Sequence, residues 1–420
     1  MHRLVCRQSP RRERTSCRVL TRLYSRLSTP RLNASCESPE PLLSANRTNR
    51  QTRQSNMAPS TLTPEQLQAM LAAQLAMPHP VSGSDDQYQP KAQPYHVFED
   101  GKWLAVTETK EPQSSAVSKT VTLLTWNIDF LVPHGDARMR AALAYLSSLV
   151  SNLPNDPLVI FFQEMTRSDL SLISSARWIQ DRFYVTDLDT SNWISDGYGT
   201  TTLIDRRLCL ASPPARGGSG DNSAASSSAV FRVPFPSRFQ RDGLFADLAL
   251  AAGTGAGTEG CVLRLCNVHL ESLVANPPVR PAQMRVAGKW LAKDNVEAGL
   301  LAGDCNAIEP FDATIGPENG LRDTYLELGG KESDEDGMTW GVQVPDWMRE
   351  KFGLSRMDRV FCKGKAKPIS LERIGVGVKV EEEGEGQGEW VTDHFGLKAK
   401  VELVDVELLL NETAASGMKP

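Results

Sequence analysis

The sequence predicts an α/β fold, a four-layer sandwich in which two mainly antiparallel sheets face each other and helices cover the outside. Two observations lead to this prediction. Along residues 92–405, short apolar runs that are typical of buried strands alternate with amphipathic stretches of helical period. The hydrophobic fraction of 40% and the charged fraction of 23% are those of an ordinary globular protein with a buried core.

The individual strands, helices and loops follow from the local pattern. Apolar runs predict strands at 121–126, 158–162, 198–204, 245–250, 262–268, 299–302, 359–362 and 397–403. Apolar residues at helical spacing predict helices at 137–150, 168–183 and 281–294. Segments rich in small and turn-forming residues predict surface loops at 212–229 and 251–260, and an acidic, glycine-rich segment predicts a solvated turn at 381–389.

The chain is expected to have four parts. Residues 1–56 form a basic Arg/Ser-rich tail, 57–91 a helix and linker, 92–405 the folded domain, and 406–420 a flexible C-terminal tail. The first part contains an apolar helical face with arginines largely elsewhere, as in an organelle transit peptide. A disordered tail, or an extension before a natural start at Met57, are the simpler interpretations.

Composition excludes several classes of protein. No run of 18 apolar residues occurs, so no membrane span is predicted. The eight cysteines form no CxxC pair, which argues against a zinc site or a disulfide framework and suits a reducing compartment. Residues 1–56 carry a net charge of +9 and the whole chain −5, so the remainder carries −14. This acidic body disfavours broad binding along duplex nucleic acid but allows a small site for one phosphate.

Polar residues follow or precede the apolar runs at six places that lie far apart in the sequence. These are Leu124–Asp129, Phe161–Glu164, Asn267–Ser272, Gly303–Asn306, Met357–Arg359 and Thr392–His394. Each alone is explained by turn chemistry, because Asn and Asp often satisfy backbone groups after a strand. Together they supply the carboxylates, amides and imidazoles that hold a divalent cation and a phosphate. They therefore predict a metal-dependent phosphodiesterase site.

Glu164 is the strongest single candidate for a metal ligand. It comes directly after the apolar residues 158–162 and Gln163, and a buried carboxylate is costly unless it is paired, protonated or bound to a metal. Asn127 and Asp129 also follow a predicted strand, but for them a strand-end turn is the simpler explanation.

Two pairs of residues suggest acid–base chemistry. Asp304 and Asn306 lie two positions apart, so on an extended backbone they point to the same side and can hold and deprotonate a water. Asp358 could hydrogen-bond one ring nitrogen of His394, which would fix its tautomer and favour the imidazolium. His269, at the end of a predicted strand, is on its own more simply a structural histidine.

The motifs TWN, QE, HLES, GDxN, DR and DH resemble the endonuclease/exonuclease/phosphatase superfamily, whose members bind a divalent metal and hydrolyse phosphoesters. Within it, the chain is most similar to the tyrosyl-DNA phosphodiesterase 2 branch, which removes topoisomerase remnants from DNA 5′ ends. Thr125–Asp129, Val233–Pro236, His269–Ser272 and Met338–Trp340 carry this likeness, which covers residues 120–405.

The resemblance implies a DNase I-like fold for the catalytic domain and Mg²⁺, or Mn²⁺, as the cofactor. It implies a nucleic-acid end with a 5′-phosphotyrosyl or similar phosphodiester as the partner, and a monomeric DNA-repair hydrolase in the nucleus. The Arg-rich segment at 1–56 makes the mitochondrion the alternative location.

The resemblance also assigns a role to each residue around the metal and the attacking water. Glu164, helped by Asp129, would hold the metal. Asn127 would orient the metal-bound phosphate. Asp304 would act as general base or proton donor, while Asn306 would position the attacking water.

The remaining site residues would act on the phosphate and the rest of the substrate. His269 and His394 would hold the non-bridging phosphate oxygens and stabilise charge in the transition state. Asp358 and Asp393 belong to the same catalytic set. The substrate-binding residues would be Ser272, Tyr198, Trp340 and Arg241, the two aromatic rings lying against the DNA end.

Two arginines that the branch has after these motifs are missing. Leu273–Val274 stands where the branch has Thr-Arg, and Ala307–Ile308 where it has Leu-Arg. Arg241, Arg280 and Arg285 are the candidates to replace them. The departures favour an alternative hypothesis, a superfamily hydrolase that acts on RNA ends or a small phosphodiester. A third hypothesis, a catalytically silent binding module, is disfavoured by the intact set of catalytic residue types.

Overall fold

The structure is a computed structural model, which describes Ala76, Pro80 and residues 88–107, 116–195, 197–211, 228–251, 260–381, 384 and 386–411. The predicted tail at 1–56, nearly all of the segment 57–87 and most of the predicted loops at 212–229 and 251–260 lie outside the described residues. No helix among the described residues is long and apolar enough to cross a membrane.

Two large sheets form the centre of the fold. The first has seven strands in the order β1 (Lys91–Gln93), β9 (Val230–Pro234), β10 (Asp242–Ala249), β11 (Val262–His269), β12 (Val296–Asp304), β14 (Asp358–Gly364) and β13 (Arg322–Asp323). All neighbours in it are antiparallel except β11 and β12, which are parallel.

The second sheet has eight strands and the same kind of parallel pair at its centre. Its order is β15 (Ala366–Ile374), β16 (Gly396–Leu403), β5 (Thr120–Asn127), β6 (Leu158–Met165), β8 (Gly199–Asp205), β7 (Phe183–Val185), β2 (Tyr95–Glu99) and β3 (Lys102–Val106). Only β5 and β6 are parallel. A separate small sheet pairs β4 (Val117–Ser118) with β17 (Leu408–Leu409).

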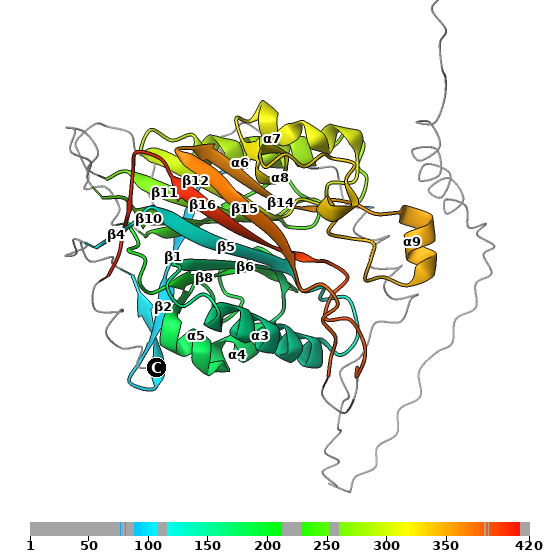
Figure 1. The fold of residues 1–420 in the computed structure, drawn as a ribbon, viewed down its shortest axis with the longest axis horizontal. Helices are drawn as coiled ribbons and strands as arrows, with labels where there is room; N and C mark the ends of the chain where they lie inside the picture. The colour runs from blue at the N-terminus through cyan, green and yellow to red at the C-terminus, as the bar shows by residue number, and fades with distance from the viewer. Residues whose placement is uncertain are drawn as a thin grey trace, which may run out of the picture. The chain divides into compact units, whose positions relative to one another are not determined.

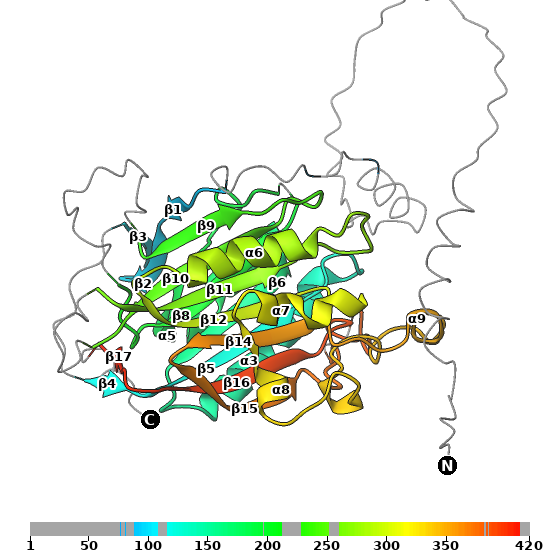
Figure 2. The same cartoon turned by 90° about the horizontal axis from the view of Figure 1, so that it is seen from above.

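Helices cover both outer faces of the sheets. The helices α3 (Gly135–Ser151), α4 (Arg167–Ser175) and α5 (Arg177–Arg182) lie on the eight-stranded sheet, and α6 (Arg280–Leu291), α7 (Ile315–Glu318) and α8 (Thr324–Glu327) lie on the seven-stranded side (Figure 1). Seen from above, α6 and α7 lie over β10, β11, β12 and β14 (Figure 2). This arrangement confirms the predicted four-layer sandwich. The short helix α9 (Asp346–Phe352) projects beyond the sheets (Figure 1).

The central strands are buried on both faces, which explains why their sequences are continuously apolar. In β5, Val121 and Leu123 face the core between the two sheets, whereas Leu124 and Trp126 face the core under α3 and α4. A third core lies between the seven-stranded sheet and α6. Each apolar run therefore ends where the chain leaves the core, and the residue after it comes to the edge of the sandwich.

The structure corrects two predicted boundaries. The helix expected at 168–183 is divided into α4 and α5 by Ala176, which has an extended conformation. The hydroxyl groups of Ser174 and Ser175 bond back to the carbonyls of Ser171 and Leu172, a local pairing that competes with the helix. Residues 406–411 of the tail expected at 406–420 belong to the described fold, because β17 pairs with β4 and buries Leu408, and residues 412–420 lie outside the described residues.

Candidate active site

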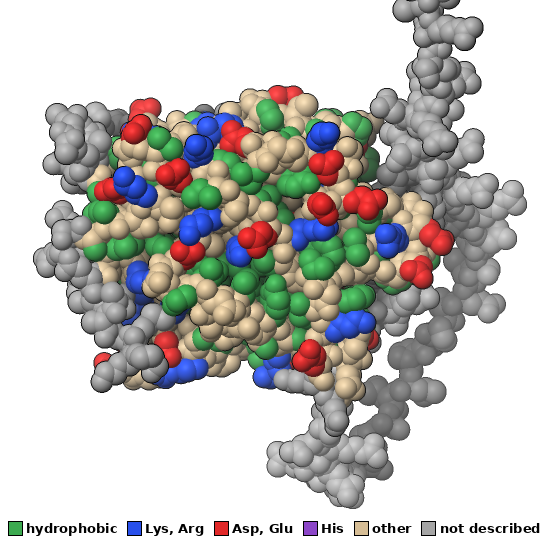
Figure 3. All heavy atoms as spheres, in the orientation of Figure 1, with side chains coloured by type: hydrophobic (Ala, Val, Ile, Leu, Met, Phe, Trp, Pro, Cys, Tyr) green, Lys and Arg blue, Asp and Glu red, His purple; other side chains and the backbone are tan. Residues whose placement is uncertain are grey.

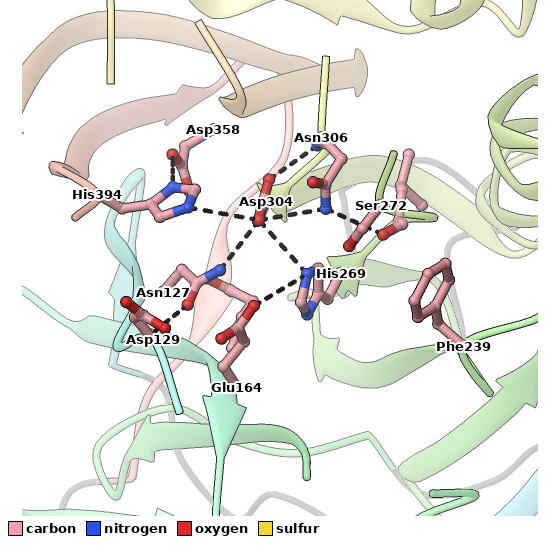
Figure 4. A network of polar contacts seen from close by, with 12 residues as sticks. Asn127, Asp129, Glu164, Phe239, His269, Ser272, Asp304, Asn306, Asp358 and His394 are labelled. Atoms are coloured by element: carbon pink, nitrogen blue, oxygen red, sulfur yellow. Dashed lines mark hydrogen bonds and ion pairs between the residues drawn. The ribbon is translucent and has the colours of Figure 1, made fainter. Parts of the chain in front are cut away.

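The predicted site residues meet because the ends of five strands converge on one edge of the sandwich. In the parallel pair β5–β6, Asn127 lies opposite Gln163, and in the parallel pair β11–β12, His269 lies opposite Asp304. The antiparallel strand β14 begins with Asp358, opposite Asp304. The residues drawn together in Figure 4 include Asn127, Asp129, Glu164, His269, Ser272, Asp304, Asn306, Asp358 and His394.

Gly303 allows the close approach between β11 and β12 on which this arrangement depends. Its φ is +142°, and a Cβ atom there would lie 1.9 Å from the carbonyl oxygen of Val268. Any side chain would push the strands apart at the pair that carries His269 and Asp304. The close approach of the two strands therefore explains the glycine of the GDxN motif. It also brings Asp304 Oδ2 to 3.4 Å from His269 Nε2.

Asp304 is the centre of the network. Its carboxylate accepts hydrogen bonds from Asn127 Nδ2 at 3.0 Å and from the backbone N–H of Asn306 at 2.8 Å. Burial raises the pKa of Asp304 to about 6, an effect that the neighbouring His394 opposes. An acid with this pKa can accept a proton and release it near neutral pH, which is the property required of a general base or acid.

The surroundings of His394 favour its imidazolium form. Its Nδ1 lies 2.7 Å from Asp358 Oδ2, so the predicted contact between these residues is present. Burial lowers the pKa of His394, but the carboxylates of Asp358, Asp393 and Asp304 outweigh burial and raise it well above its usual value. The other ring nitrogen, Nε2, points toward Asp304 at 3.9 Å.

His269 is in the opposite state. Its Nδ1 lies 2.6 Å from Arg241 Nη1, and because a guanidinium can only donate, Nδ1 must accept. The ring proton therefore sits on Nε2, which faces Glu164 Oε1 at 3.6 Å and Asp304 Oδ2 at 3.4 Å. Burial, Arg241 and His394 together lower the pKa of His269 well below its usual value. The site thus contains one charged and one neutral histidine.

Glu164 and Asp129 are held in unusual backbone conformations. Their φ angles are +63° and +49°, and that of Asn306 is +47°, in the left-handed region that side chains avoid. Such strain persists only where the surroundings impose it, and it concentrates at functional sites. Glu164 is fixed by the backbone N–H of Phe130, which donates to its Oε2 at 3.0 Å.

A divalent cation fits the cluster around Glu164. Among the described residues, Glu164, His269 and Asp304 have potential ligand atoms within 4.8 Å of one another, and Asp304, Asp358 and His394 form a second such group. Since His269 Nε2 carries a proton, the carboxylate oxygens are the ligands that the first group offers to an ion. Asp129 stands outside both groups. Burial raises the pKa of Glu164 and of Asp129, and Asp393 raises both further, so a cation would relieve repulsion among these acids. Carboxylate oxygens select hard ions such as Mg²⁺ or Mn²⁺.

Arg241 is the only one of the three replacement candidates that contacts the predicted site. Its Nη2 donates to Ser272 Oγ at 2.8 Å, and its guanidinium lies 4.9 Å from the centre of the Tyr198 ring. Arg280 is buried and pairs with Asp312, with both distances 2.8 Å, so it fixes a loop. Arg285 is an exposed residue of α6, the helix on the outer face of the sheet.

The two aromatic residues expected to stack on a nucleic-acid end are mostly covered. Trp340 is 8% exposed, and its Nε1 donates to Asp393 Oδ2 at 2.6 Å. Tyr198 is 9% exposed and stacks on Phe130 with 4.5 Å between ring centres. The exposed rings on this side are Trp347 and Phe352 of α9, at 60% and 42%. Neither ring could be predicted from the sequence, because both lie between the motifs Met338–Trp340 and Met357–Arg359 and belong to neither.

Arg241 is positioned by Glu271, a buried carboxylate for which the sequence predicted no role. Glu271 accepts hydrogen bonds from Ser237 Oγ at 2.6 Å, from the backbone N–H of Arg238 at 3.0 Å and from Gln283 Nε2 at 3.2 Å. The Ser237 oxygen in turn accepts the backbone N–H of Arg241 at 3.1 Å. Glu271 of the HLES motif therefore anchors the loop that supplies the arginine.

The sequence matches the Endonuclease/Exonuclease/phosphatase family over residues 124–394, from the first motif to the last. No curated protein matches it. The solved structures that resemble it include humanized D. rerio TDP2 with 14 mutations, at 22% identity and a TM-score of 0.49, covering 68% of this chain and 100% of that one.

Two further structures are similar. D. rerio TDP2 in complex with a single-strand DNA product has 20% identity and a TM-score of 0.49, covering 67% of this chain and 99% of that one. An endonuclease/exonuclease/phosphatase from Bacteroides vulgatus has 13% identity and a TM-score of 0.44, covering 68% and 99%. Since the family match spans well over half of the sequence and includes every motif of the site, the chain belongs to the endonuclease/exonuclease/phosphatase family of metal-dependent phosphoester hydrolases.

Proposed function

We propose that the protein is a Mg²⁺-dependent phosphodiesterase that acts at nucleic-acid ends, with 5′-tyrosyl DNA as its substrate and the repair of topoisomerase adducts as its task. The observation that carries the proposal is the convergence of Asp304 and two histidines at one edge of the sandwich, with Asp304 Oδ2 3.4 Å from His269 Nε2 and 3.9 Å from His394 Nε2. This set can take a proton from water and offer two N–H donors to a phosphate.

Glu164, helped by the neighbouring Asp129, would hold the ion, which when bound would neutralise charge on the phosphate and polarise it. Asp304 would take the proton of a water positioned by Asn306. Asn127, which donates to Asp304 Oδ2, would keep that carboxylate in place. The N–H groups of His269 and His394 would donate to the phosphate oxygens, where charge builds up in the transition state.

Support for a nucleic-acid end comes from α9. Trp347 and Phe352 are exposed, and Lys351 Nζ lies 5.9 Å and 5.0 Å from their ring centres. The Phe352 ring is 6.3 Å from that of Trp340, whose backbone pairs with His394. Exposed aromatic rings beside a cation can stack on bases, at about 1–3 kcal/mol per base.

The second candidate is hydrolysis of RNA ends or of a small phosphodiester. Two observations favour it. The body of the chain is acidic, and on the face shown in Figure 3 basic and acidic side chains are interspersed and form no continuous basic patch. In addition, neither missing arginine of the HLES and GDxN motifs is restored in sequence, although Arg241 contacts the site from another loop.

A panel of substrates tests the proposal: a 5′-phosphotyrosyl oligonucleotide, an abasic duplex, an RNA and a phosphoinositide, each with Mg²⁺ and with excess EDTA. We expect release of tyrosine from the first, dependent on the metal and lost in Asp304→Asn. Cleavage of another substrate at a higher kcat/KM would give the second candidate precedence. If none of the four substrates is cleaved, the catalytically silent binding module is the hypothesis that remains.

The proposed form and location can be tested with the same protein. We propose a monomer in the nucleus, with the mitochondrion as the alternative. Light scattering of the purified chain measures its mass, and imaging of a tagged chain with and without residues 1–56 shows which compartment that segment addresses.

A further inference from the structure

Two irregular segments carry acids on the metal side of the active site. The Asp129 segment, residues 128–134, connects β5 with α3, and the Asp393 segment, residues 389–395, leads into β16. Burial raises the pKa of Asp129 and of Glu164, and the nearby charge of Asp393 raises both further. Acids of like charge on two irregular segments repel each other, so their spacing must be held by other contacts.

The Asp129 segment also fixes the side chain of Glu164. The backbone N–H of Phe130 donates to Glu164 Oε2 at 3.0 Å, and that of Leu131 donates to Asp129 Oδ1 at 3.1 Å. Asp129 near the start of the segment and His134 at its end both have positive φ angles, +49° and +62°. A conformation that side chains avoid persists only where other contacts impose it. The path of this segment, and with it the place of the Glu164 carboxylate, therefore depends on what holds its far end.

Arg138 of α3 holds this far end and joins it to the Asp393 segment. Its Nε donates to the carbonyl of Pro133 at 2.8 Å, and its Nη1 donates to the carbonyl of Val391 at 3.2 Å. Its Nη2 pairs with Glu389 Oε2 at 3.1 Å, and the whole side chain is buried. Because the guanidinium is planar and its donors point in fixed directions, the two carbonyls are kept at a set separation.

A second contact joins the same two segments at the end of β5. The hydroxyl of Thr392 donates to the carbonyl of Asn127 at 2.9 Å. Arg138 adds an attachment further along the chain, four residues after Asp129 and two residues before Asp393. Two points of attachment fix the relative orientation of the segments as well as their distance, which one point cannot do.

We propose that Arg138 is a positioning residue for the divalent cation. By bracing the Asp129 segment against the Asp393 segment, it keeps the acids of the metal side at the spacing that an ion requires. The inference rests on the proposed function, because it takes Glu164 and Asp129 to hold the ion. Arg138 acts through the backbone of the two segments, while its charge is paired with Glu389. Loss of the two carbonyl contacts therefore weakens metal binding, whereas loss of the charge on Glu389 does not.

Metal affinity measured without substrate tests the proposal. Titration calorimetry of the full chain with Mn²⁺ gives a Kd, and the rise of the melting temperature with Mg²⁺ concentration gives a second measure of binding. Arg138→Lys keeps the positive charge but replaces the planar fork with a single ammonium, which cannot donate to both carbonyls in the same geometry. Loss of a residue that orients metal ligands costs about 10–100-fold in affinity, so we expect the Kd to rise at least about ten-fold.

Two control variants separate the brace from other roles of the arginine. Glu389→Gln removes the charge that Nη2 pairs with and leaves both carbonyl contacts, so its Kd should remain that of the wild-type chain. Arg140→Lys makes the same change at an exposed position two residues further along α3 and should also leave the Kd unchanged. Circular dichroism and the melting temperature without metal show whether each variant folds. If Arg138→Lys does not fold, Arg138→Gln, whose amide keeps one donor group, must raise the Kd in the same way.

An unchanged Kd in folded Arg138→Lys overturns the proposal, as does a wild-type chain that binds no Mn²⁺. An equal rise of the Kd in Glu389→Gln also overturns it, because the effect would then come from the ion pair and not from the carbonyl contacts. The proposed function fails separately, through the substrate panel. A chain that hydrolyses none of those substrates but loses metal affinity in Arg138→Lys has the braced metal site without the proposed activity.

Discussion

Replacing Ser237 by alanine should both destabilise the protein and disturb the position of Arg241. The change removes three hydrogen bonds: one of 2.6 Å to the buried carboxylate of Glu271, and two of 3.0 and 3.1 Å from the backbone N–H groups of Phe239 and Arg241. A hydrogen bond to a charged group contributes about 1.5–3 kcal/mol and a neutral one about 1. Water can reach the half-buried loop and replace part of this, so we expect a loss of about 3 kcal/mol.

Urea unfolding followed by circular dichroism measures this loss, provided that the slope of the transition is unchanged. Ser151→Ala is the control, because Ser151 is an exposed residue whose hydroxyl makes one bond, to the carbonyl of Ser147. Its effect should stay within about 0.5 kcal/mol. Kinetics add a second readout, since a displaced Arg241 should also raise KM.

The reasoning would be refuted if Ser237→Ala were as stable as Ser151→Ala. An equal loss of stability with unchanged KM and kcat would show that the Glu271–Ser237 contact holds the loop but does not position Arg241.

Three further predictions concern the reaction and the fold. Asp304→Asn should lower kcat by about 10²–10⁴-fold with substrate affinity retained, because it removes the proton acceptor and keeps the shape; single-turnover kinetics and equilibrium binding separate the two effects. Glu164→Gln should abolish Mg²⁺-dependent turnover with little loss of folding, as measured by activity against metal concentration and by melting temperature. Trp347→Ala should weaken binding of an oligonucleotide end by about 1–3 kcal/mol, and more than it affects a small chromogenic phosphodiester, as measured by the two KM values.

Each of these has an outcome that contradicts it. Full activity of Asp304→Asn would remove that residue from the reaction, and activity of Glu164→Gln, or of the wild-type chain in excess EDTA, would remove the metal site. Equal effects of Trp347→Ala on both substrates would mean that α9 does not capture nucleic acid.

The assembly of the site could be predicted from sequence because polar residues that end buried runs must reach an edge of the sheets. Which of Arg241, Arg280 and Arg285 contacts the site could not be predicted from sequence. The burial of Arg280 depends on Asp312, and the place of Arg241 depends on a hydrogen bond from Ser237 to Glu271, contacts between segments 32 and 34 residues apart. The exposure of a ring such as Trp340 likewise depends on a distant partner, Asp393, 53 residues away.

The strands and helices likewise include some that the sequence predicts and some that it does not. The long central strands were predictable because burial on both faces leaves a continuous apolar run. The outer strands β2 and β3 were not, since each has only five residues, β2 alternates between buried and partly exposed residues, and no residue of β3 is fully buried. The break at Ala176 depends on serine hydroxyl groups that bond locally, which periodicity alone does not reveal.

The hydrogen bond from Asn127 to Asp304 joins residues 177 positions apart, one in each of the two sheets. Neither sheet contains the reaction centre by itself. Catalytic competence should therefore be gained in a single late event during folding, when the two sheets dock, and a partly folded chain with only one sheet formed should be inert. For a phosphoester hydrolase, this coupling means that a chain emerging from the ribosome should stay inactive until its core has closed.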